Sequence, residues 1–105
     1  MASVMFQYDR PTDNRLWAEY NRQVRDWIAD LLALPGAVSF MAYRTADGAS
    51  PNTITILEFR TLNEARAAVS SEQMKGVLQS LRTVGSHATV LLVERSPFTP
   101  EPIRA

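Results

Sequence analysis

Four segments of this chain are too apolar for strands that leave one face of a sheet in water. Residues 54–59 read Ile-Thr-Ile-Leu-Glu-Phe, and residues 90–93 read Val-Leu-Leu-Val. A half-exposed strand alternates apolar and polar side chains, whereas nearly continuous apolar runs are typical of strands that are covered on both faces. We therefore predict four strands, at residues 3–9, 37–45, 53–61 and 88–95.

Two helical regions separate these strands. The first is predicted to start at a capping residue among Thr12, Asp13 and Asn14 and to end near Leu34, before Pro35 and Gly36. Its apolar residues recur every three or four positions, which is the spacing of one buried helix face: Leu16, Tyr20, Val24, Trp27, Leu31 and Leu34, widened by Trp17 and Ile28. The second region opens with a capping box of Thr61 and Glu64 and is predicted to break near Ser70 and Ser71.

The order strand, helix, strand, strand, helix, strand predicts a ferredoxin-like α+β fold with one four-stranded antiparallel sheet. Asp47-Gly48 supplies a turn for an antiparallel hairpin between the second and third strands. The 105 residues fit one domain spanning residues 1–105. Residues 96–105 carry three prolines and are predicted to form an extended tail, lying over a partner subunit.

Helices on one face of a four-stranded sheet leave the other face uncovered. Because all four strands are apolar on both faces, something must cover the second face, and a second copy of the chain is the simplest cover. The sequence therefore predicts a homodimer that pairs through its sheet faces and encloses a space between them.

Composition narrows the choice of partner. Eleven basic residues balance eleven acidic ones, so we expect neither nucleic acid nor an anionic membrane as a partner. The chain has no cysteine, and a single histidine without ligand-spaced carboxylates predicts no metal site. We expect a cytoplasmic protein, because no apolar run approaches the roughly 20 residues of a membrane span and no secretory signal is visible.

Three residues are the candidates for acid–base or electrostatic catalysis. His87 is the only histidine and the only possible imidazole base. Glu58 and Arg60 share a face of the third strand by its two-residue period, and they would point into the space between the sheets together with Ile54 and Ile56. The alternatives are a solvated loop histidine and an ion pair that fixes the dimer register.

Aromatic residues near the ends of the elements are the candidates for binding a planar ligand. Trp17 and Tyr20 lie at the start of the first helix, where a crevice between helix and sheet would open, while Trp27 is assigned to the core. Arg44 is a candidate for holding an anionic or enolate-like group. The predicted ligand-binding residues are Tyr8, Trp17, Tyr20, Phe40, Tyr43 and Arg44.

Several stretches resemble the dimeric α+β barrel superfamily, and most nearly its antibiotic-biosynthesis-monooxygenase-like domains. They are Leu57-Glu58-Phe59-Arg60, Leu62-Asn63-Glu64-Ala65-Arg66-Ala67, Ser71-Glu72 and Leu92-Val93-Glu94-Arg95-Ser96-Pro97. The resemblance implies a dimer joined through its sheets and a pocket between sheet and helices or within the barrel. Active members oxidise polycyclic phenols without a cofactor, degrade haem or isomerise lactones. The histidine that several groups carry in the second helix is replaced here by the stretch Ala67-Ala68-Val69.

Three functions remain open at this point. The first is a cofactor-independent, monooxygenase-like enzyme acting on a small aromatic or polyketide-like molecule. The second is a dimeric module that binds a small apolar ligand without converting it. The third is a structural dimer whose barrel is filled by its own side chains. No cofactor is predicted for any of them.

Overall fold

The computed structural model describes residues 1–105 and has the predicted ferredoxin-like fold. Its four strands form one antiparallel sheet in the order β2-β3-β1-β4. The elements in chain order are β1 (Ala2–Asp9), α1 (Asn14–Leu32), β2 (Ala37–Arg44), β3 (Thr53–Phe59), α2 (Leu62–Val69), α3 (Glu72–Val84) and β4 (Ser86–Glu94).

Capping side chains set where the helices begin. Asp13 caps α1, and its carboxylate accepts the backbone N–H groups of Arg15 and Leu16. The second helical region divides as predicted, because Ser71 accepts the backbone N–H of Met74 and starts a new helix two residues after α2 ends. Each such cap satisfies an N–H group that the first helical turn leaves without a partner.

β3 is two residues shorter than predicted, and helix capping is the reason. Thr61 caps α2 by accepting the backbone N–H of Glu64, so the chain has already turned away from the sheet at that point. Arg60 lies in the connection between β3 and α2. Its backbone N–H donates to the carbonyl of Gly36 and does not extend the hydrogen-bond ladder with β2. The period-two argument that placed Arg60 beside Glu58 therefore fails.

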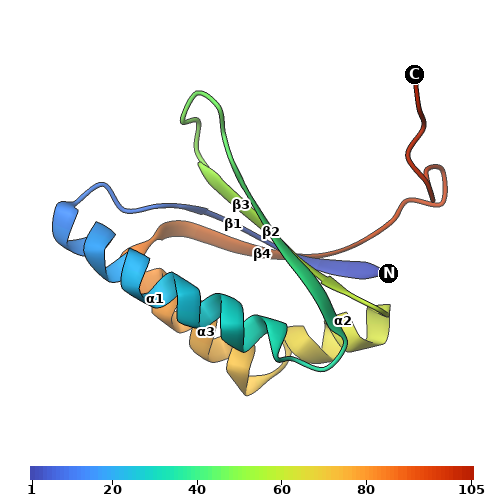
Figure 1. Ribbon diagram of the computed structural model, residues 1–105, viewed down its shortest axis with the longest axis horizontal. Coiled ribbons are helices and arrows are strands. Elements are labelled where there is room, and N and C mark those ends of the chain that lie inside the picture. The colour runs from blue at the N-terminus through green and yellow to red at the C-terminus, as the bar shows by residue number, and fades with distance from the viewer.

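All three helices pack against one face of the sheet (Figure 1). Alternate residues of β1 and β3 point toward them and form the centre of the core, with Val4, Leu57 and Phe59 completely buried. The predicted stripe of α1 supplies the opposite side of this core: Tyr20, Trp27 and Leu31 are buried in the helix, and Leu34 is buried just after it. Trp27 is thus a core residue, as predicted.

The other face of the sheet, here called the open face, is apolar at its centre. The strand register places one residue from each strand in a single row across the sheet: Met41, Ile56, Met5 and Leu91. Met41 and Leu91 at the two ends of this row are 56% and 46% exposed. No helix of the chain covers this row (Figure 1).

Residues 96–105 leave the sheet after β4 and contain neither helix nor strand. Arg95 holds the start of this tail, because its Nη1 donates to the carbonyl of Pro100 at 2.9 Å. The tail then runs away from the helical layer (Figure 1), and Phe98 and Ile103 are almost fully exposed. No helix combines the length and the apolar character that crossing a bilayer requires.

Candidate functional site

A cavity of about 180 Å³ lies between α1 and the part of the sheet formed by β1, β2 and β3. All six predicted ligand-binding residues line it, although they come from three different elements, β1, α1 and β2. That they bind a ligand stays a prediction. The lining consists of Tyr8, Arg10, Trp17, Tyr20, Asn21, Val24, Ile28, Phe40, Ala42, Tyr43, Arg44, Thr53 and Thr55.

Small side chains on the helix-facing side of the sheet create this space. Near one end of the sheet these positions hold Ala42, Thr53 and Thr55, whereas toward the other end they hold Leu57 and Phe59, which fill the core. Ala42 stays exposed although it pairs with the buried Thr55. The helix-facing residues of β2 are therefore less covered than those of β1 and β3, and the gap remains open there.

The inner wall of the cavity carries a pair of hydrogen-bonded phenols. Tyr8 and Tyr20 are 4% and 7% exposed, and their hydroxyl oxygens lie 2.6 Å apart. Burial, helped by the hydrogen bond with Tyr20, raises the pKa of Tyr8 well above its ordinary value. Tyr8 therefore stays protonated at neutral pH and can donate a hydrogen bond, but it cannot supply a phenolate base.

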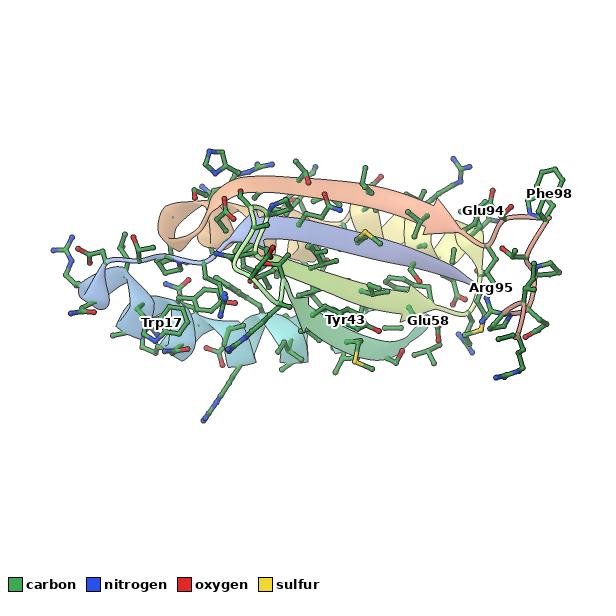
Figure 2. All side chains as sticks on the ribbon, turned by 90° about the horizontal axis from the view of Figure 1, so that it is seen from above. Trp17, Tyr43, Glu58, Glu94, Arg95 and Phe98 are labelled. Atoms are coloured by element: carbon green, nitrogen blue, oxygen red, sulfur yellow. The ribbon has the colours of Figure 1, made fainter.

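An aromatic ladder continues from this pair toward solvent. The ring of Tyr20 lies 5.8 Å from that of Trp17 and 5.9 Å from that of Trp27. The guanidinium of Arg10 sits 5.7 Å from the centre of the Trp17 ring, in a cation–π arrangement. Trp17 is 36% exposed and marks a side on which the cavity opens, near the N-terminal end of α1 (Figure 2). Tyr43 is 53% exposed and lies farther along the sheet (Figure 2), where its pairing with Ile54 gives it the face of Met41.

The candidate base His87 is part of a different cluster. Its Nδ1 lies 3.0 Å from Oδ2 of Asp9, which also accepts the hydroxyl of Ser50 at 2.5 Å. The other carboxylate oxygen of Asp9 accepts the backbone N–H of Asn52. The cluster ties the β2–β3 loop to the ends of β1 and β4, while the imidazole itself is largely exposed and does not line the cavity.

Glu58 and Arg60 lie away from both groups. Glu58 sits on the open face in a shallow pocket with Ser3, Val93 and Arg95, at the end of the sheet opposite Trp17 (Figure 2). Arg60 is exposed and donates to Oε2 of Glu64 at 2.9 Å. The three candidate catalytic residues are thus not brought together.

Two groups of residues at these sites were not predicted from the sequence. Thr53 and Thr55 line the cavity from β3, and the signal was available, since they occupy the same face of that strand as Leu57 and Phe59. A polar residue at a core-facing position indicates a site of this kind, because a buried hydroxyl needs a hydrogen-bond partner. The contact of Asp9 with His87 had no such signal, because 78 residues separate the two along the chain.

The substitution Asp9→Asn is expected to remove a pH-dependent part of the stability. The hydroxyl of Ser50, with smaller contributions from the N–H of Asn52 and from His87, lowers the pKa of Asp9 below its ordinary value of 3.8. A carboxyl with a lowered pKa stabilises the fold above the pKa of the unfolded chain, and this contribution is lost as the pH falls through the folded-state pKa.

Urea unfolding of both proteins between about pH 6 and pH 2 measures this effect. The wild type should be more stable near pH 6, and its advantage should shrink as the pH falls below about 4. Asp30→Asn, on the exposed side of α1, controls for the loss of a carboxylate elsewhere. A difference that stays constant over the whole pH range would contradict the assignment.

Comparisons with known proteins identify the fold but no close relative. No family model and no curated protein matches the chain. A Deinococcus radiodurans structure, provisionally assigned as an antibiotic biosynthesis monooxygenase, aligns with a TM-score of 0.73 at 8% identity, over 100% of this chain and 98% of that one. A variant of SnoaB, a cofactor-independent oxygenase from Streptomyces nogalater, gives 0.70 at 17%, over 95% and 97%. An EthD family protein from Bacillus halodurans gives 0.69 at 14%, over 91% and 99%. The chain therefore has the ferredoxin-like α+β fold of the antibiotic-biosynthesis-monooxygenase-like proteins.

Proposed function

We propose that the chain is a homodimer that binds a small aromatic molecule in the cavity between α1 and the sheet. The observation that carries the proposal is the composition of the cavity wall. Most of its lining is apolar or aromatic, and a few hydroxyls and charges lie at defined places. Small-molecule sites have this character, because apolar walls supply affinity and a few polar groups fix the orientation.

Loss of the Trp17 ring should weaken such binding. Trp17 forms the outer end of the aromatic ladder, so Trp17→Ala removes a stacking surface and is expected to raise the Kd for an aromatic probe about 10-fold. Titration with 2-naphthol, followed by fluorescence anisotropy, measures the change. Phe98→Ala is the matched control, since it removes an exposed aromatic ring from the tail. Equal losses in the two variants would mean that the probe adsorbs to exposed rings and not to the cavity.

The dimer is supported by the apolar row across the open face. A two-fold axis through the middle of that row would place Met41, Ile56, Met5 and Leu91 against the same residues of a second copy, as a self-complementary interface requires. The neighbouring rows contain polar residues, including Ser39, Glu58 and Ser3 on one side. An apolar centre with a polar rim is the usual pattern of a protein interface.

A charge in this row should separate the subunits. In the dimer, Leu91→Asp would bury an unpaired carboxylate at two symmetric places, at a cost of several kcal/mol each, and weaken the dimer by at least about 1,000-fold. Leu32→Asp is the matched control, because Leu32 is similarly exposed but lies on α1. Native mass spectrometry should give twice the 11.8 kDa chain mass for the wild type and the control, and the chain mass for Leu91→Asp. A wild-type monomer would contradict the dimer.

A second candidate function is cofactor-independent oxidation of the bound molecule. The fold likeness to SnoaB, a cofactor-independent oxygenase, favours it. In such a reaction the substrate supplies the electrons: a methylene carbon loses two hydrogens and takes one atom of O2 as a carbonyl, and the other oxygen atom leaves as water. In this chain the hydroxyls of Tyr8 and Tyr20 are the groups placed to hold the oxygen of the substrate.

Oxygen uptake in the presence of anthrone tests this function. If the reaction takes place in the cavity, the wild type should exceed the uncatalysed rate, Trp17→Ala should lose most of the excess, and His87→Ala should keep it, since His87 lies outside the cavity. Loss of turnover in His87→Ala would instead favour the histidine mechanism predicted from the sequence. Binding without any uptake above background would leave a non-catalytic binding module.

A further inference from the structure

The inner wall of the cavity holds hydroxyl groups whose hydrogen-bonding capacity the chain does not use up. Tyr8 and Tyr20 share a single hydrogen bond, in which either oxygen can be the donor. Each phenol carries one proton, and the shared bond uses only one of the two. Whichever phenol accepts therefore keeps a proton with no acceptor in the protein. A buried donor without a partner is unfavourable, which makes this proton a point of attachment for a ligand.

Thr55 adds a third hydroxyl to the same wall. Its residue is only 4% exposed, and its side chain forms no hydrogen bond within the chain. Every fully enclosed polar side-chain atom of the protein does have a hydrogen-bond partner. The hydroxyl of Thr55 must therefore touch open space. The open space beside Thr55 is the cavity together with a second, apolar space of about 30 Å³, here called the extension, which shares Tyr8, Phe40 and Thr55 with the cavity lining.

The surroundings of these hydroxyls select a neutral ligand group. The extension is lined by Val24, Trp27, Ile28 and other apolar side chains, with Thr55 and the phenol of Tyr8 as its polar groups. The cationic residues Arg10 and Arg44 line only the main cavity, and Arg44 is exposed. An anion at the inner end would lose its hydration without gaining a counter-ion, whereas a carbonyl oxygen would lose much less.

The size of the cavity limits the number of ligand rings that fit inside it. An apolar cavity of about 150 Å³ is sufficient to hold benzene. The cavity here is about 180 Å³, shares lining residues with the 30 Å³ extension and opens to solvent beside Trp17. One or two fused rings fit inside it, and further rings would project through the opening.

We propose that the cavity selects one- or two-ring aromatic ketones, whose carbonyl oxygen accepts hydrogen bonds from the Tyr8–Tyr20 pair and from Thr55. This inference rests on the proposed binding function and specifies the ligand class of that site. Because burial keeps the pKa of Tyr8 high, Tyr8 remains protonated at neutral pH, and the spare proton of the hydrogen-bonded pair favours an acceptor over a second donor.

A pair of probes that differ by one oxygen tests the inference. 1-Tetralone is a two-ring aromatic ketone, and tetralin is the same ring system without the carbonyl. Isothermal titration calorimetry with the full chain is expected to give about 10-fold tighter binding of 1-tetralone. The double substitution Tyr8→Phe/Tyr20→Phe should lower the preference for 1-tetralone over tetralin. A second variant that also carries Thr55→Val should bring the two affinities closer to equality.

Two features of the variants keep the outcome interpretable. Removing both partners of a hydrogen bond while keeping the shape of the side chains is close to neutral for stability, so the double Phe variant is expected to fold. Thr99→Val is the control, since it removes an exposed hydroxyl from the tail, outside the cavity, and should keep the full preference. Thermal unfolding of each variant verifies that it is folded.

The results separate this inference from the function on which it rests. Tighter binding of the ketone by the wild type and by Thr99→Val, lost in the double Phe variant, supports it. Equal affinity of the two probes, or a preference that survives in the double Phe variant, overturns it while leaving aromatic binding in place. Failure of both probes to bind up to their solubility limits overturns the inference and the proposed function together.

Discussion

The structure depends on a sheet that the helices of its own chain cover on one side only. The helix-facing residues of β1 and β3 form the core, while the opposite face keeps a row of four apolar residues without a partner in the chain. Within the covered side, the helix-facing residues of β2 stay partly exposed, and the small residues Ala42 and Thr55 leave a gap beside them. The open face accounts for the proposed dimer, and the gap beside β2 accounts for the proposed ligand site.

The fold was readily predictable because its signals are local and repeated. The strand runs, the three-to-four-residue spacing along α1 and the caps at Thr61 and Ser71 each point to the same architecture, and the antiparallel sheet follows from their order. The predicted end of β3 was wrong by two residues. A threonine can continue a strand or cap a helix, and at Thr61 the capping bond to the N–H of Glu64 determined the result.

The candidate site was predictable in part, and the physical reasons differ between its residues. Tyr8, Tyr20 and Trp17 come together because the first helix returns along the first strand, so neighbouring elements bring their ends into contact. His87 and Arg60 were selected as candidate catalytic residues for the chemistry of their side chains alone. That chemistry does not indicate where a residue lies in the fold. The contact of His87 with Asp9 depends on how β4 pairs with β1, and the ion pair of Arg60 with Glu64 depends on where β3 ends.

An amide NMR titration of the ¹⁵N-labelled protein with 1-tetralone tests the central claim most directly. If the ligand binds between α1 and β2, the largest chemical-shift changes should fall in the residues that line the cavity: Trp17, Tyr20, Val24 and Ile28 of α1 and Phe40, Ala42 and Thr55 of the sheet. Changes centred on the row of Met41, Ile56, Met5 and Leu91 with none along α1 would place the ligand on the open face and contradict the account.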